Sequence, residues 1–423
     1  MKTYRVWYLL IPLLALLPAG TRLLWWQRAT VHANVDAAVA SAGQALFVHE
    51  WQPNDPLCAD GDGLGPVFNA RSCVACHNQG GPGGGGDLRF NVTTFTLRQA
   101  GQPAREGVVH SGHTAGANRG ETLQDVHPTL PAVSAPTLAQ VVALPGQSNH
   151  CLSFPTGVHI SQRNTPALFG SKLIDEIPER VILASAKAQQ AKWGMAPADG
   201  EELPVGRAPR LASGRIGRFG WKGQMASLSD FVQAACANEL GLSNPDHPQP
   251  TPLYQTAVAS TKIDLTRMQC DELTAFCASL PKPVERRVEG TSDADAAAGN
   301  KLFRSVGCAE CHTPNLGDVD GIYSDLLLHR MGADLVGGGS YGEPPLPLPD
   351  GSDDGPAPSE WRTPPLWGVA DSAPYMHDGR APTLADAVKL HGGQGARARA
   401  NYVKLNTADQ SRLFAFLQTR RAP

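Results

Sequence analysis

The chain alternates between short segments with apolar residues at helical spacing and long stretches that show no period. Residues 36–47, for example, are rich in alanine and place apolar side chains on one face of a helix. The irregular stretches are 100–160, 185–216 and 337–360. We therefore predict a mainly α protein with long irregular loops and excursions. Its helices are expected at residues 36–47, 227–240, 265–280, 296–306, 382–390 and 408–417.

The first residues form a separate apolar segment. Lys2 and Arg5 precede a run that extends from Val6 to Trp26 and is broken mainly by Thr21 and Arg22. A charged start followed by an apolar stretch is typical of an export signal, and this run is also long enough to span a bilayer. We expect residues 1–33 to be either a cleaved signal peptide or a membrane anchor.

Composition narrows the class of protein. Glycine and proline number 44 and 35 in 423 residues, which favours short helices with long connections. At 42% hydrophobic content the chain is too apolar for a disordered protein. The formal net charge of −3 gives no reason to expect binding to nucleic acid or to a membrane surface.

Two copies of one motif carry the chemistry of the chain. The sequence Cys-x-x-Cys-His occurs at Cys73–His77 and again at Cys308–His312. Two thiols at this spacing bond covalently to the two vinyl groups of one haem, and the adjacent imidazole becomes the proximal iron ligand. The chain is therefore expected to bind two c-type haems through Cys73, Cys76, His77, Cys308, Cys311 and His312.

Two other interpretations of the motif fit less well. A zinc site needs a second pair of ligands at short spacing, and no such pair follows either copy. A redox-active dithiol does not need the histidine. Covalent haem attachment also requires export, which agrees with the apolar N-terminal segment.

Five further cysteines remain, and an oxidising compartment would favour disulfides between some of them. We predict pairing of Cys58 with Cys151, and of Cys236 with Cys270 or Cys277. The alternative is that several of these thiols are small buried hydrophobic side chains.

A second repeat supports two haem units. Residues 163–170 and 362–368 share the core Thr-Pro-x-Leu-x-Gly, and each copy follows one haem motif along the chain. A repeated order of motifs indicates repeated structural units. We place an N-terminal haem domain at residues 34–283 and a C-terminal one at 284–423, because Pro281-Lys282-Pro283 ends a predicted helix.

The C-terminal motifs resemble those of a known family. These are Ser324–Gly332, Glu360–Gly368, Tyr375–Arg380 and His391-Gly392-Gly393. Together with Gly63–Asn69 and Gly217–Lys222, they are similar to the bacterial di-haem oxidoreductases, some of which are labelled predicted thiol oxidoreductases. That family is related to the di-haem cytochrome c peroxidases. The resemblance implies two cytochrome c-like domains, with electrons entering at the C-terminal haem and being used at the N-terminal haem.

The resemblance also suggests a sixth ligand for the C-terminal haem. In the peroxidases this ligand is a methionine downstream of a Pro-Tyr-x-His motif, but here the downstream position is His391. Met376, inside the motif Pro374-Tyr375-Met376-His377, is the rival ligand. We favour His391, and two imidazoles would give this haem a lower potential than a histidine–methionine pair.

Further roles are implied by the same resemblance. Asp175 or Glu176 would be the acid beside the reactive haem, and Trp221 would lie between the haems. Carbonyl groups of Ser372 and Pro374 match a calcium-binding position. The acids have a plainer alternative as an acid pair at a helix start, and Trp221 as a buried core aromatic. The further calcium ligands are not assigned from the sequence.

These observations predict a periplasmic di-haem oxidoreductase with peroxidase-like activity, either soluble or held by its N-terminal segment. Its partners would be a small electron donor, such as a cytochrome or a cupredoxin, and a small oxidant such as peroxide. The alternatives are a non-enzymatic electron carrier and a haem oxygenase that acts on a polymer or a protein. A thiol–disulfide role has no support, because no Cys-x-x-Cys occurs outside the haem motifs.

Overall fold

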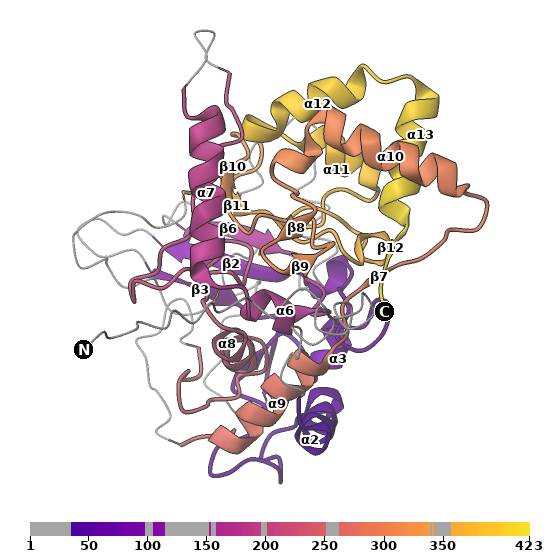
Figure 1. Ribbon diagram of the computed structural model, residues 1–423. Helices are drawn as coiled ribbons and strands as arrows, with labels where there is room; N and C mark the ends of the chain where they lie inside the picture. Colours follow the sequence, from indigo (N-terminus) through magenta and orange to yellow (C-terminus); the bar gives the residue numbers. More distant parts are fainter. Residues whose placement is uncertain are drawn as a thin grey trace, which may run out of the picture. The chain divides into compact units, whose positions relative to one another are not determined.

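The computed structural model describes residues 35–97, 105–114, 152–153, 158–195, 201–250, 262–338, 341 and 357–423 (Figure 1). The apolar segment at 1–33, with its predicted signal or anchor, lies outside these residues. Contacts group Ala37–Pro423 into one compact unit. None of the described helices is both long enough and apolar enough to cross a bilayer. The domain boundary after residue 283 stays a prediction.

The described part is mostly helical, as expected, and every predicted helix is present. Five of these helices begin with a side chain that accepts a hydrogen bond from the first turn, namely Ser227, Thr266, Ser292, Thr383 and Asn406. The helices are α2 (Ala37–Val48), α3 (Cys73–Cys76), α6 (Ser171–Asp175), α7 (Glu179–Trp193), α8 (Leu228–Leu240), α9 (Arg267–Ser279), α10 (Asp293–Val306), α11 (Leu384–Leu390), α12 (Ala396–Val403) and α13 (Thr407–Gln418), with 3-10 turns η1 (Leu88–Phe90), η2 (Cys308–Glu310), η3 (Val369–Asp371) and η4 (Gly393–Gly395).

The helix that precedes each haem motif crosses another helix at a glycine. A Cβ atom on Gly43 of α2 would lie 1.8 Å from the Glu272 carbonyl oxygen of α9. In the same way, a Cβ atom on Gly299 of α10 would lie 1.9 Å from the Arg412 carbonyl oxygen of α13. Only glycine allows backbones to approach this closely.

Each crossing is completed by a pair of phenylalanines, the first of which follows the glycine by four residues. The Phe47 and Phe276 rings are 4.8 Å apart, and the Phe303 and Phe416 rings are 5.4 Å apart. The sequence repeat is thus also a structural repeat, with a glycine crossing and an aromatic pair ahead of each Cys-x-x-Cys-His motif.

Two apolar clusters lie behind the two haem motifs. The larger contains side chains from α2, α8 and α9, and Cys73 packs against it. The smaller contains side chains from α10 and α13, and Cys308 packs against it. In Figure 1 the helices α10, α11, α12 and α13 gather in one group, and α2, α8 and α9 gather in another.

A small antiparallel sheet was not predicted. It has the strand order β3-β2-β6-β5 and is built partly from residues expected to be an irregular excursion. Hydrogen-bonded ribbons elsewhere are β1–β4, β10–β11, β7–β12 and β8–β9. The strands are β1 (Val67–Phe68), β2 (Val92–Leu97), β3 (Arg105–Val109), β4 (Gly112–His113), β5 (Leu152–Ser153), β6 (Val158–Arg163), β7 (Val284–Glu285), β8 (Asn315–Leu316), β9 (Val319–Asp320), β10 (Leu328–Arg330), β11 (Glu360–Arg362) and β12 (Arg420–Arg421).

The predicted disulfide at Cys236 is wrong. Cys236, Cys270 and Cys277 are free thiols buried in the larger apolar cluster. They pack there as small hydrophobic side chains, and burial raises the pKa of the Cys270 thiol to about 11. Cys58 also carries a free thiol, and its predicted partner Cys151 lies outside the described residues.

Replacing Gly299 by alanine should destabilise the protein by about 1–3 kcal/mol, because the new methyl group would force α10 and α13 apart. Unfolding of the holoprotein in guanidinium chloride, followed by circular dichroism, measures this loss. Ala297→Leu adds bulk at an exposed site on the same helix and should leave the midpoint nearly unchanged. Equal midpoints for Gly299→Ala and the wild type would contradict the close crossing.

Candidate functional site

The Cys308–His312 motif has the geometry of a haem attachment site. It follows α10 through Gly307, whose φ of 106° turns the chain. Nδ1 of His312 lies 3.0 Å from the Tyr323 carbonyl oxygen, so this nitrogen carries the proton and Nε2 is left to bind a metal. Burial lowers the pKa of His312 to about 4, which keeps the ring neutral.

The Cys73–His77 motif repeats this arrangement. Nδ1 of His77 lies 3.1 Å from the Gly84 carbonyl oxygen, and burial lowers the pKa of His77 to about 4. The glycine loop that follows the motif is tightly folded, since a Cβ atom on Gly84 would lie 1.7 Å from the Gln79 carbonyl oxygen. Both histidines thus present a neutral, fixed Nε2 atom beside two cysteines, which fits a proximal haem ligand.

A largely apolar cavity of about 460 Å³ adjoins the second motif. Cys308, Cys311 and His312 line one part of its wall, and His391 and Met376 line another. Nδ1 of His391 lies 2.7 Å from the Ala387 carbonyl oxygen, so its Nε2 is also left free. The cavity has the donor set and the apolar lining that suit a haem held by His312. Both candidate sixth ligands are on its wall, and the choice of His391 stays a prediction.

Both Thr-Pro boxes contribute to the same cavity. Its wall includes residues 164–169 of the first box and 362–367 of the second. Trp221 lies between them, because its indole nitrogen donates to the Asn164 carbonyl (2.8 Å) and its own carbonyl accepts from the Arg362 amide (2.9 Å). Trp221 therefore joins the segments that follow the two motifs and lines the cavity at the second motif, and its place between two haems stays a prediction.

Asp175 and Glu176 lie outside the residues that line this cavity. Asp175 accepts a hydrogen bond from the Leu228 amide (2.9 Å) at the start of α8. Glu176 is paired with Lys172 at 3.8 Å, and over a third of its side chain is exposed. These two contacts, with the Leu228 amide and with Lys172, stabilise the local fold. The role of Asp175 or Glu176 as the acid of the reactive haem stays a prediction.

Glu239 is a half-buried acid that was not predicted from the sequence. It lies at the end of α8, accepts a hydrogen bond from the Asn69 side chain (2.8 Å), and is close enough to Cys76 to raise the pKa of that thiol. Burial raises the pKa of Glu239 to about 7. Tyr341 lies beside it, and burial together with the Glu239 carboxylate raises the pKa of this phenol. The sequence signal was a carboxylate at the end of a predicted helix.

The predicted calcium position lies in the loop that joins the two parts of the site. Ser372 donates from its hydroxyl to the Gly368 carbonyl (2.9 Å), and both Ser372 and Pro374 line the cavity. Gln79, two residues after the first motif, donates to the Ala373 carbonyl (2.6 Å). The loop therefore ties the two motifs together, and bound calcium stays a prediction.

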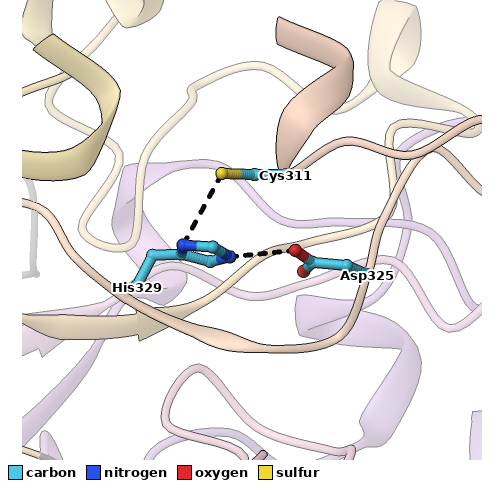
Figure 2. Close-up of side chains that lie close together, drawn as sticks. All are labelled: Cys311, Asp325 and His329. Atoms are coloured by element: carbon cyan, nitrogen blue, oxygen red, sulfur yellow. Dashed lines mark hydrogen bonds and ion pairs between the residues drawn. The ribbon is translucent and has the colours of Figure 1, made fainter. Parts of the chain in front are cut away.

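Cys311, Asp325 and His329 form a group whose ligand atoms lie within 4.8 Å of one another (Figure 2). In isolation such a group resembles a metal site. However, Cys311 belongs to the haem motif, and a thioether bond to haem removes the thiolate that would bind the metal. We therefore assign Asp325 and His329 to the surroundings of the second haem.

A comparison with known families agrees with this site. Residues 147–420 match the family described as "Di-haem oxidoreductase, putative peroxidase". The chain belongs to this di-haem oxidoreductase family. Its members are di-haem enzymes, so haem is the cofactor for which the two motifs are built. Haem supplies a redox-active iron that exchanges single electrons and binds small oxidants.

No curated protein matches this di-haem oxidoreductase. Several solved structures are similar to it. The hydrazine synthase of Kuenenia stuttgartiensis has 16% identity and a TM-score of 0.41, with 99% of this chain and 98% of that chain covered. A MauG-like protein associated with microbial copper homeostasis has 19% identity and a TM-score of 0.30, with 58% and 90% covered. The di-haem peroxidase BthA of Burkholderia thailandensis has 20% identity and a TM-score of 0.25, with 36% and 50% covered.

Replacing His391 by alanine should convert the C-terminal haem of this oxidoreductase from low spin to high spin, because His391 would be its predicted sixth ligand. Absorption and electron paramagnetic resonance spectra of the purified holoprotein measure the change. Met376→Ala is the matched control and should stay low spin. The opposite result, in which only Met376→Ala becomes high spin, would assign the sixth ligand to Met376.

Proposed function

We propose that this di-haem oxidoreductase is a periplasmic peroxidase with two cytochrome c-like haem units. In this proposal, electrons from a small cytochrome or cupredoxin enter at the His312 haem and are used at the His77 haem, where hydrogen peroxide is reduced. The observation that carries the proposal is a difference between the two motifs. The second site offers two imidazoles, His312 and His391, whereas a half-buried acid, Glu239, lies near the first.

A haem held by both His312 and His391 would favour electron transfer over substrate binding, because the protein would supply both of its iron ligands. Reactive haem sites, in contrast, need a group that moves protons. Glu239 suits this task, since its pKa of about 7 lets it accept and release a proton near neutral pH. The difference therefore supports electron uptake at the second site and chemistry at the first.

The proton balance defines the task of Glu239. Hydrogen peroxide takes up two electrons and two protons, its O–O bond breaks, and two water molecules leave. The Glu239 carboxylate would accept a proton from the peroxide oxygen that binds and return it to the oxygen that leaves. Electrons would pass between the two haem sites through Trp221, because this residue lies between the segments that follow the two haem motifs.

Glu239→Gln should lower kcat/KM for hydrogen peroxide by about 10²–10⁴-fold, since an amide cannot accept the proton. The wild-type kcat/KM should fall as the pH drops below about 7, where Glu239 becomes protonated, and this dependence should be absent in the variant. Steady-state kinetics with a reduced cytochrome as donor measure both effects.

Glu285→Gln is the control for this experiment, because Glu285 is an exposed acid paired with Arg420. It should leave both the rate and its pH dependence unchanged. A large loss of activity in Glu176→Gln or Asp175→Asn, together with an active Glu239→Gln enzyme, would return the acid role to the residues predicted from the sequence.

A further inference from the structure

His329 is a buried histidine whose two ring nitrogens both have partners. It lies on β10, is 2% exposed, and lines the cavity of the second haem motif. Its Nε2 atom lies 2.9 Å from Oδ2 of Asp325. On the other side of the ring, Nδ1 lies 2.9 Å from Oε1 of Gln394 and 3.6 Å from Sγ of Cys311. Figure 2 shows the imidazole between the cysteine and the carboxylate.

The neighbours of His329 fix its charge. Gln394 donates from its amide nitrogen to the Val205 carbonyl (3.0 Å), so its oxygen must face His329 as an acceptor. Asp325 offers only carboxylate oxygens. Both ring nitrogens of His329 therefore act as donors, which requires an imidazolium cation.

Hydrogen bonds hold this ion pair in one orientation. Asp325 accepts from the Leu327 amide (2.9 Å) and from the side-chain nitrogen of Gln189 (2.7 Å). The same Gln189 nitrogen donates to the carbonyl of Glu310 (2.9 Å), inside the haem motif. The positive end of the pair thus faces Cys311, while the negative end is held on the far side of the ring.

We propose that the His329 cation raises the reduction potential of the haem attached at Cys308 and Cys311. A fixed positive charge at the edge of a buried redox group disfavours the more positive, ferric state. Gln394, three residues after His391, extends the same hydrogen-bond network to the turn that carries the expected sixth ligand. His329 is therefore a positioning residue that acts through the haem and contacts no substrate.

The positive charge of His329 would help the second haem to accept electrons from a donor protein. Two imidazole ligands give a low potential, which makes the haem a poor acceptor of electrons from a donor protein. A cation beside Cys311 offsets part of this effect. The inference rests on the haem of the second motif having His312 and His391 as ligands, but it does not depend on which oxidant reacts at the first haem.

Removal of the charge should lower this potential. In His329→Gln, the ratio of ferric to ferrous C-terminal haem at a fixed applied potential should rise about tenfold, equivalent to about 59 mV for one electron. His329→Lys keeps the charge and should stay close to the wild type. His247→Gln is a matched control, because His247 forms a similar pair with Asp230 (2.9 Å) that is partly exposed and lies outside the lining of the haem cavity.

Spectroelectrochemical titration of the holoprotein measures the potential without any turnover, so a failed peroxidase assay cannot be mistaken for failure of this proposal. Equal potentials for His329→Gln and His329→Lys would overturn it. If His329→Gln does not fold, Gln394→Glu places a negative charge beside the intact pair and should also lower the potential. An unchanged potential in Gln394→Glu would equally overturn the proposal.

Discussion

The architecture depends on the close crossing of two helices ahead of each haem motif. At Gly43 and at Gly299 the backbones touch, so α9 and α13 fix where α2 and α10 lie. In the second unit, α10 ends at Val306 and the haem motif starts two residues later, so its cysteines are placed almost directly by the crossing. Cys73 and Cys308 each pack against the apolar cluster beside their own crossing.

The two units share this framework but differ in the groups that surround them. Each proximal histidine is held by a backbone carbonyl, Gly84 in the first unit and Tyr323 in the second. The second unit adds His391 and the ion pair of His329 with Asp325, which we propose act on an electron-transferring iron. The first unit adds Glu239, whose proposed task is to move protons. A repeated scaffold can thus support two different tasks.

Much of this framework could be predicted from sequence, because helix spacing and the Cys-x-x-Cys-His motif are local signals. The small sheet was missed because its buried positions include polar residues such as Thr94 and Ser161, which hide the usual alternation. Helix α7 was missed because it buries little, chiefly Ile182 and Gln189, and so shows no apolar stripe. Glu239 and His329 were missed because their chemistry arises from partners distant in sequence, Asn69 and Gln394 respectively.

The central claim is that one haem transfers electrons while the other binds the oxidant. Cyanide binding to the half-reduced holoprotein, followed by electron paramagnetic resonance, tests it most directly. We predict that cyanide binds to one haem only, and that Cys73→Ala/Cys76→Ala, which removes the first attachment site, abolishes this binding. Two low-spin haems that bind neither cyanide nor peroxide would contradict the account and indicate an electron carrier.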